Sequence, residues 1–249
     1  MIKALVFDLD GVLLDSEPVW DRSRREVVES AGGKWQPGST AAMQGMSAPE
    51  WAHEMKLTLN VDLPEAAIID LVVAKVLEQY QRDMPLYPGA LGAVARLSAR
   101  WPLALASSSN RVVIDQVLTL AGLTNFFGVT VSSEEVDRGK PAPDVHIEAA
   151  RRLHLDPRYC LAIEDSTNGI RSAVAAGLRV VAIPDRRDPP AAATLAQAAL
   201  TLAGLDDLTV DAIERLDAEE MEAADRRVDA EEDESFPASD AHSDWAGPG

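Results

Sequence analysis

Short runs of apolar residues alternate along the chain with stretches in which apolar positions recur every three or four residues. The apolar runs cover residues 2–7, 103–107, 128–132, 160–164 and 179–183, with a weaker run at 198–202. Runs of this length predict buried strands, and the patterns between them predict helices. The predicted helices cover residues 110–121, 143–154 and 167–176. This alternation predicts an α/β fold with a parallel central sheet covered by helices on both faces.

One part of the chain departs from the alternation. Residues 17–85 contain no convincing strand, but they contain helical patterns at 18–31, 48–58 and 64–82. This stretch follows the first strand directly and ends in a segment rich in proline and glycine. A helical insertion at that point would cover the edge of the sheet where ligands bind. We therefore predict a three-layer, Rossmann-like core (1–15 and 86–216) and an inserted α-helical cap (16–85), with hinges near 14–17 and 84–89.

Negative charge is concentrated at the end of the chain. The net charge is −18, from 23 basic and 41 acidic residues. Residues 218–249 hold eleven acids and two arginines, a net charge of −9, which leaves −9 for the rest of the chain. This segment has few large apolar residues, so it cannot bury enough surface to offset the entropy of ordering. We predict a frayed helix to about Arg227 and an acidic, disordered, solubilising tail over 217–249.

The composition also excludes several kinds of partner. The excess of negative charge argues against nucleic acids and anionic membranes, which bind basic patches. No apolar run reaches the roughly 18–20 residues that span a bilayer, and acidic residues follow the first strand too soon for a signal peptide. We therefore expect a cytoplasmic protein, a monomer, whose partner is a small molecule.

Cysteine and histidine give no sign of a metal centre. Cys160 is the single cysteine, which excludes an internal disulfide and a cysteine-based zinc site. It lies in an apolar run and is interpreted as a buried, inert thiol. Four histidines show no spacing typical of metal ligands. His146 and His154 fall in a predicted helix, where we interpret them as surface or packing residues.

Two carboxylates follow the first strand. Asp8 and Asp10 come directly after the apolar run and precede Gly11. In an extended chain this spacing places both carboxylates on one side, at the edge of the sheet where ligands bind. Two charges this close require compensation, and a site rich in oxygen suits Mg²⁺. Taken alone, the pattern also fits a plain turn, because aspartate and glycine are common in turns.

Three further segments place polar residues at the ends of predicted strands or helices. One strand ends in Ser107 and Ser108, whose hydroxyls and backbone amides at a helix start suit an anion, although one serine could serve as a simple N-cap. Lys140 lies in a loop stiffened by two prolines, where a lysine is usually a solvated charge. Another buried strand ends in Glu164 and Asp165.

Together, and in this order, the four segments resemble the four motifs of the haloacid dehalogenase superfamily. The resemblance covers residues 1–185 and leaves the acidic tail unexplained. It rests on the sequences DLDGVLLDSE at 8–17, GKPAPD at 139–144 and EDS at 164–166. Within the superfamily the chain looks most like the branch of β-phosphoglucomutases and sugar-phosphate phosphatases that carry an α-helical cap.

The resemblance implies a Mg²⁺-dependent phosphatase that acts on a small phosphate monoester, such as a sugar phosphate. It implies that Asp8 is the nucleophile and forms an aspartyl-phosphate, while Asp10 acts as general acid and then as general base. It also implies that the metal is held by the Asp8 carboxylate, the Asp10 backbone carbonyl and Asp165, with Glu164 orienting this set of ligands.

The resemblance further implies how phosphate is bound. Ser107 and the amide of Ser108 would contact phosphate oxygens, and Lys140 would neutralise their charge. Asp144 would hold Lys140 in place. Because the body of the protein carries about −9, a phosphate dianion is repelled at long range, and binding depends on positive charge concentrated in a cleft.

Three alternatives remain. A dehalogenase would not use the second acid, because halide leaves without a proton, so Asp10 favours a phosphate ester. A non-catalytic binding module of the same fold would be expected to have lost Asp8, Asp10, Lys140 or Asp165, and all four are present. A mutase of the β-phosphoglucomutase type is the closest alternative to a phosphatase.

The cap bears on the choice between mutase and phosphatase. Similar mutases carry a histidine early in the cap and a cation after the cap glycine, and the positions here are Trp20 and the loop 45–51. No cation stands there to hold a second phosphate group, which favours hydrolysis, although Lys56, Lys75 or Arg82 could substitute. The residues predicted to shape the leaving-group pocket, or alternatively to pack the cap core, are Glu17, Trp20, Met46 and Trp51.

Overall fold

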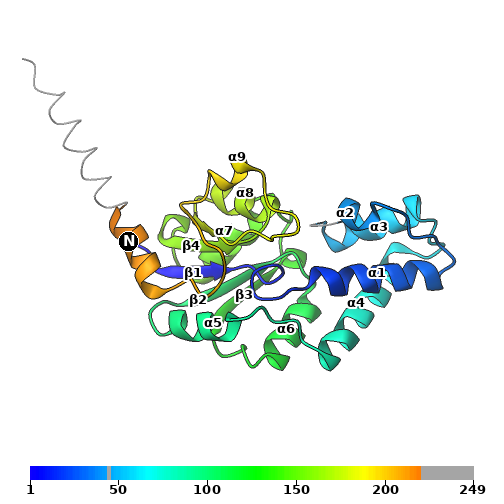
Figure 1. The fold of residues 1–249 in the computed structure, drawn as a ribbon, viewed down its shortest axis with the longest axis horizontal. Coiled ribbons are helices and arrows are strands. Elements are labelled where there is room, and N and C mark those ends of the chain that lie inside the picture. The colour runs from blue at the N-terminus through cyan, green and yellow to red at the C-terminus, as the bar shows by residue number, and fades with distance from the viewer. Residues whose placement is uncertain (44–45, 220–249) are drawn as a thin grey trace, which may run out of the picture.

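A parallel sheet forms the centre of the Rossmann-like core (Figure 1). The computed structural model describes residues 1–43 and 46–219. Within them six strands lie in the order β3-β2-β1-β4-β5-β6. Their bounds are β1 Ala4–Phe7, β2 Leu103–Ser107, β3 Phe127–Ser132, β4 Cys160–Glu164, β5 Arg179–Ala182 and β6 Leu200–Thr201. The first strand is central, because Phe7 pairs with Leu105 on one side and Ile163 on the other.

Alternation along β1 explains why helices cover both faces. Ala4 and Val6 belong to one apolar cluster, which includes buried residues of α7 (Asp144–Arg152) and α8 (Thr167–Ala175). Leu5 and Phe7 belong to the other cluster, which includes α5 (Ala90–Ser98) and α6 (Arg111–Leu120). Successive side chains of a strand point to opposite faces, so a strand that is apolar at every position must be covered on both.

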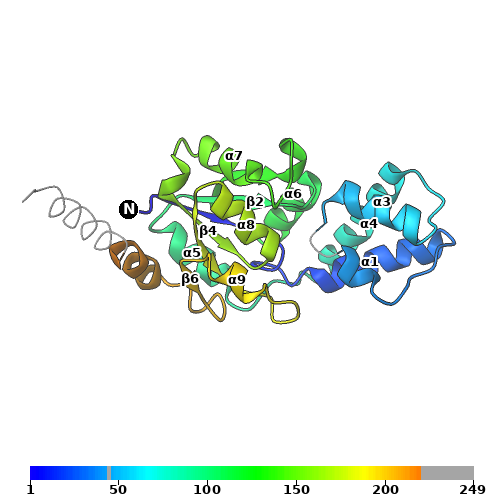
Figure 2. The ribbon, with the colours of Figure 1, turned by 90° about the horizontal axis from the view of Figure 1, so that it is seen from above.

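Four helices form the cap, which extends from one end of the sheet (Figure 2). They are α1 Glu17–Ser30, α2 Ser39–Met43, α3 Ala48–Thr58 and α4 Glu65–Arg82. The start of α3 is fixed by a capping box, in which Glu50 accepts hydrogen bonds from the amide (2.8 Å) and hydroxyl (2.6 Å) of Ser47. Val28, Met55 and Val72 are buried where these helices pack together.

The two connections between cap and core lie side by side. The amide of Asp15 donates to the carbonyl of Pro85 (2.8 Å), and the amide of Tyr87 donates to the carbonyl of Leu13 (2.9 Å). Arg187, from the loop after β5, donates to Asp15 (2.5 Å) and to the Tyr87 hydroxyl (3.4 Å). The predicted hinges therefore pair with each other, and a core arginine contacts both.

The predicted fold class is confirmed. Each predicted strand is present to within a few residues of its predicted bounds. Helices α2, α5 and α9 (Ala192–Leu195) were not predicted, nor were the 3₁₀ turns Ser133–Glu135 and Pro157–Tyr159. The first and last of these helices are too short to show helical periodicity.

Some predictions about organisation lie beyond what the structure describes. The domain boundaries stay predictions. Residues 210–219 are helical, but the rest of the predicted frayed helix and acidic tail falls at 220–249, outside the described residues. Across the described part of the chain, every helix is either too short or too polar to cross a membrane.

Candidate active site

A cavity of about 220 Å³ lies where the carboxyl ends of the strands meet the cap. Its walls come from the segments after β1, β2, β4 and β5, from the Lys140 loop, and from α1 and α3 of the cap. Because parallel strands end at a common edge, residues 8, 108, 140 and 165 line this one cavity despite their separation in sequence.

Asp8 and Lys140 form a buried ion pair at the bottom of this site. Asp8 follows the last residue of β1, and its Oδ1 lies 3.1 Å from Lys140 Nζ. The same ammonium donates to Glu164 Oε1 at 2.7 Å. Burial lowers the pKa of Lys140, but the attraction of Asp8 and Glu164 outweighs this effect and raises it, so the lysine is positively charged.

Three buried carboxyl groups form a cluster with the geometry of a cation site. Oxygens of Asp8, Glu164 and Asp165 lie within 4.8 Å of one another. Burial raises the pKa of Asp8 to about 7, and burial and then Asp8 raise that of Asp165. The cluster therefore carries more acidic groups than Lys140 alone compensates. One of its oxygens, Glu164 Oε2, is buried and has no hydrogen-bond partner among the residues that the structure describes. This donor set fits a hard divalent cation.

Gly11 makes room for one of these carboxylates. Its φ is +80°, and a Cβ built there would lie 1.9 Å from Asp165 Oδ2. We expect Gly11→Ala to lose about 1–2 kcal/mol of unfolding free energy through backbone strain and also to displace Asp165, which would weaken cation binding measured by calorimetry. Gly32 is a matched control, because its φ is +78° with nothing within 4 Å of the added Cβ. If Gly32→Ala weakens cation binding as much as Gly11→Ala does, the displacement argument is wrong.

Asp10 lies on another wall of the same cavity. Its Oδ2 accepts from the Ser109 hydroxyl at 2.6 Å and more distantly from Ser107 at 3.5 Å. Its Oδ1 accepts from the indole nitrogen of Trp20 at 3.4 Å. The chain bends at Leu9, so the two aspartates are not brought together by an extended backbone as the spacing argument assumed. Asp10 instead connects the core to the cap.

The serine segment after β2 differs in part from the predicted anion site. Ser108 lines the cavity, whereas Ser107 is fully buried, outside the lining, and accepts from the amide of Ser109 at 3.0 Å. The amide of Arg111, at the start of α6, donates to a carboxylate of the protein itself, Glu134, at 2.7 Å. That amide is therefore already occupied, and the segment before the helix supplies the groups that face the cavity.

Comparison with known proteins identifies the family. The model of the haloacid dehalogenase-like hydrolases matches residues 2–177. The chain belongs to this family. Hexitol phosphatase B of Escherichia coli is 32% identical over 194 residues, which is 74% of this chain and 84% of that protein. These matches confirm the predicted superfamily and the prediction that the chain is a phosphoric monoester hydrolase.

Solved structures of the family share the architecture. CbbY from Rhodobacter sphaeroides, in complex with phosphate, is 26% identical with a TM-score of 0.74, covering 84% of this chain and 96% of that one. β-Phosphoglucomutase from Clostridium difficile superimposes with a TM-score of 0.76 at 20% identity, covering 89% and 99%. The second likeness concerns the fold alone.

One part of the hydrolase site was missed in the sequence. His146 is fully buried on α7, and its ring nitrogens contact Ser172 Oγ (2.8 Å) and Glu164 Oε1 (3.0 Å). The Ser172 hydroxyl donates its proton to the carbonyl of Ala142 (2.6 Å), so it must accept from Nδ1, which carries a hydrogen. His146 is therefore a buried neighbour of Glu164, which fits the packing alternative of the prediction and not the surface one. Its position beside Ala149 and Ala150 on the buried face of the helix was the available signal.

Three other interpretations of polar residues can be compared with the structure. The prediction that Asp144 holds Lys140 is wrong: Asp144 pairs with Arg138 at 2.9 Å, and Lys140 is held by the two carboxylates named above. His154 is exposed just after α7, with φ of 58°. Cys160 is buried, and burial raises the pKa of its thiol to about 11, as expected for an inert thiol.

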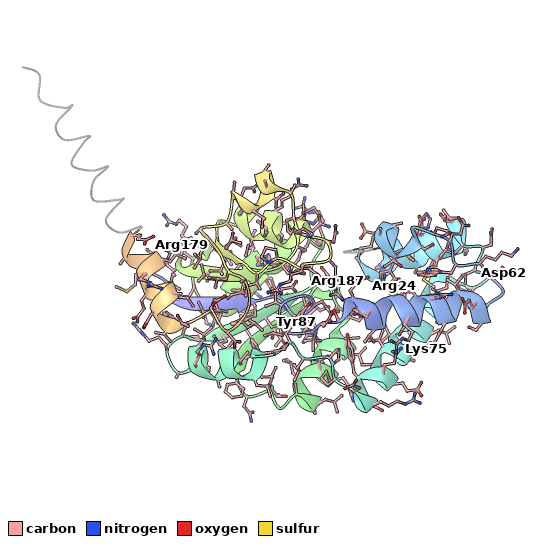
Figure 3. The ribbon with its side chains drawn as sticks, in the orientation of Figure 1. Arg24, Asp62, Lys75, Tyr87, Arg179 and Arg187 are labelled. Atoms are coloured by element: carbon pink, nitrogen blue, oxygen red, sulfur yellow. The ribbon has the colours of Figure 1, made fainter. Side chains whose placement is uncertain are left out.

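The cap contributes a wall that sequence reasoning described incompletely. All four predicted pocket residues, Glu17, Trp20, Met46 and Trp51, line the cavity. The suggested substitute cations Lys56, Lys75 and Arg82 do not. Two arginines that were not considered do: Arg24 on α1 and Arg187 on the core loop, both labelled in Figure 3.

Proposed function

We propose that this hydrolase is a Mg²⁺-dependent phosphatase that releases phosphate from a small sugar or polyol phosphate through an aspartyl-phosphate on Asp8. The observation that carries the proposal is the meeting of Asp8, Asp10 and Lys140 on one small cavity beside a cluster of buried carboxylates. A nucleophile, a proton donor and a fixed cation are the groups that phosphoryl transfer requires.

The proposed reaction has two steps. In the first, a carboxylate oxygen of Asp8 bonds to phosphorus, the bond to the alcohol oxygen breaks, and protonated Asp10 gives that oxygen its proton. In the second, Asp10 takes a proton from water as the water oxygen attacks phosphorus, which returns Asp8 as a carboxylate and frees inorganic phosphate. The position of Asp10 beside two serine hydroxyls and the Trp20 indole supports this role, because these contacts fix its orientation.

The buried acidic cluster supports the choice of Mg²⁺. Asp8 and Asp165 would hold the ion with the backbone carbonyl of Asp10, and Glu164, fixed by Lys140 and His146, would orient this set. When bound, the ion would neutralise charge on the phosphate oxygens. Hard oxygen ligands alone form the cluster, which suits Mg²⁺ better than softer metals.

Lys140 and the serine segment are the proposed phosphate ligands. Lys140 is buried and oriented by Asp8, so its charge is directed at the atoms that change during the reaction. Ser108 lies in the cavity wall, and its amide is proposed to contact phosphate oxygens. Ser107 is buried outside the lining, so it is proposed to support this segment by accepting from the Ser109 amide, in place of the phosphate contact predicted from the sequence.

The size and walls of the cavity support a small, polar leaving group. The cavity volume of about 220 Å³ is smaller than that of a typical site for a drug-sized ligand. The cap wall of this cavity combines aromatic rings with Glu17. The relative named hexitol phosphatase B supports a polyol or sugar phosphate. Cytoplasmic location and a monomeric state stay predictions.

The test is a screen for phosphate release from hexitol phosphates, hexose phosphates, phosphoglycolate, nucleotides and an aryl phosphate, with Mg²⁺ and with a chelator. We expect release that depends on Mg²⁺ and is fastest for a polyol or sugar phosphate, with free alcohol as product. Conversion of β-glucose 1-phosphate to glucose 6-phosphate would support the mutase alternative instead. Absence of release from every compound would contradict the proposal.

A further inference from the structure

The cap wall contains a buried ion pair between Arg24 and Glu17. Both residues are on α1, about two helical turns apart, and both line the cavity. Arg24 Nη1 lies 3.5 Å from Glu17 Oε1, and the Arg24 side chain is only 5% exposed. The guanidinium also lies over the ring of Trp20, 5.8 Å from its centroid. In Figure 3 Arg24 lies on the cap at its junction with the core, next to Arg187 of the core.

This pair is incompletely hydrogen-bonded. Arg24 Nε and Nη1 and Glu17 Oε1 are buried and have no hydrogen-bond partner. The two side chains are an ion pair at 3.5 Å that does not form a hydrogen bond. Buried polar atoms without a hydrogen bond are uncommon in native structures and call for an explanation. Burial raises the pKa of Glu17 and outweighs the opposing effect of Arg24, so the carboxylate form depends on the arginine beside it. The wall therefore keeps both donor and acceptor capacity for a ligand.

The charges around this pair decide which ligand fits. Among the described cap residues that line the cavity, the charged groups are Glu17 and Arg24, whose charges cancel. The others are Ser16, Trp20, Met46, Ala48 and Trp51. On the core side Arg187 is already paired with Asp15 and Asp185, while Asp188 adds a negative charge. An anionic leaving group would thus meet acids and no uncompensated cation. Hydroxyl groups can donate to Glu17 and accept from Arg24.

We propose that Arg24 and Glu17 act together as a specificity device that selects a neutral, polyhydroxylated leaving group over a carboxylate or a second phosphate. The inference rests on the proposed phosphatase function and adds its substrate class: a monophosphate whose alcohol is uncharged. The recognition is by hydrogen bonds to hydroxyls, and the rejection of anions comes from Glu17, because buried polar sites discriminate strongly against ligands that leave them unpaired or repelled.

The experiment compares two ligands of opposite character, a neutral hexitol phosphate and phosphoglycolate, whose leaving group carries a carboxylate. Dissociation constants are measured by calorimetry at excess Mg²⁺ in the Asp8→Asn background, so that no turnover is needed. The informative quantity is the ratio of the two constants. Glu17→Gln leaves Arg24 uncompensated, and we expect it to shift the ratio toward phosphoglycolate by about tenfold or more.

Arg24→Gln is expected to weaken the binding of hexitol phosphate and to leave phosphoglycolate the weaker of the two ligands. The double variant is expected to bring the ratio back to within about threefold of the parent. Arg25→Gln is the matched control, because Arg25 is the next residue on α1 but is exposed and pairs with Glu29, and it should leave the ratio unchanged. If Arg24→Gln does not fold, Glu17→Gln and the double variant carry the test.

The inference is overturned if Glu17→Gln leaves the ratio of the two dissociation constants within about twofold of the parent. It is also overturned if the binding of both ligands weakens equally, because a purely structural role of Glu17 would have that effect. Failure of the proposed function is a separate result. It shows as absent phosphate release by the wild type from the hexitol phosphate, which the binding measurement does not require.

Discussion

Asp8→Asn is expected to fold like the wild type and to lower kcat by about 10⁴-fold or more, because the amide cannot attack phosphorus. Cation binding should weaken as well, since the variant removes one of the three clustered carboxylates. Turnover of the best substrate from the screen measures kcat, calorimetry measures cation binding, and circular dichroism checks the fold. Trapping should detect an acyl-phosphate on the wild type and none on the variant.

Asp62→Asn is the matched control for this variant. Asp62 is an exposed acid at the far end of the cap (Figure 3), and the same chemical change there should leave kcat and cation binding unaltered. Substantial turnover by Asp8→Asn, once contamination and deamidation to aspartate are excluded, would remove Asp8 as the nucleophile.

Lys140→Met is expected to lower both activity and stability. The variant leaves Asp8 and Glu164 buried without their cation, and breaking a buried ion pair from one side costs about 3–5 kcal/mol of unfolding free energy. Turnover should fall by about 10²–10³-fold, because a fixed positive charge no longer faces the phosphate. Chemical denaturation and steady-state kinetics measure the two losses.

Added Mg²⁺ should raise the melting temperature of Lys140→Met more than that of the wild type, because the ion compensates carboxylates that the lysine no longer neutralises. Lys56→Met is the control: Lys56 is an exposed residue of the cap and should change stability by no more than about 0.5 kcal/mol. A Lys140→Met variant as stable as Lys56→Met would show that the carboxylates do not depend on this ammonium.

Glu164 shows where sequence patterns stop being informative. Its place after a buried strand predicted a position at the sheet edge, and the structure puts it there. Its partners could not be predicted, because Lys140, His146 and the space left by Gly169 come from three other segments. A Cβ on Gly169 would lie 1.7 Å from Glu164 Oε2. Such contacts depend on how helices pack against the sheet, which the pattern of one segment does not contain.

The cap also shows that sequence patterns do not predict contacts between segments. Periodicity predicted the helices of the cap, and the residue type of Trp20 and Trp51 predicted that they shape the pocket or pack the cap core. Which cap cation faces the cavity does not follow from either, because Lys56, Lys75 and Arg82 carry the same positive charge as Arg24. Only the rotation of α1 against α4 and the core buries Arg24 beside Glu17 and leaves Lys75 paired with Glu26 at the surface.

The sequence by itself determined the class of fold, the order of the strands along the chain and the identity of the residues at their carboxyl ends, since these depend on local periodicity and on the common edge of a parallel sheet. The tertiary structure alone decided the pairing of charges: Lys140 with Asp8 and Glu164, Asp144 with Arg138, Arg24 with Glu17. The physical reason is that an ion pair depends on distances of a few ångströms between segments distant in sequence, which are set only when the elements pack.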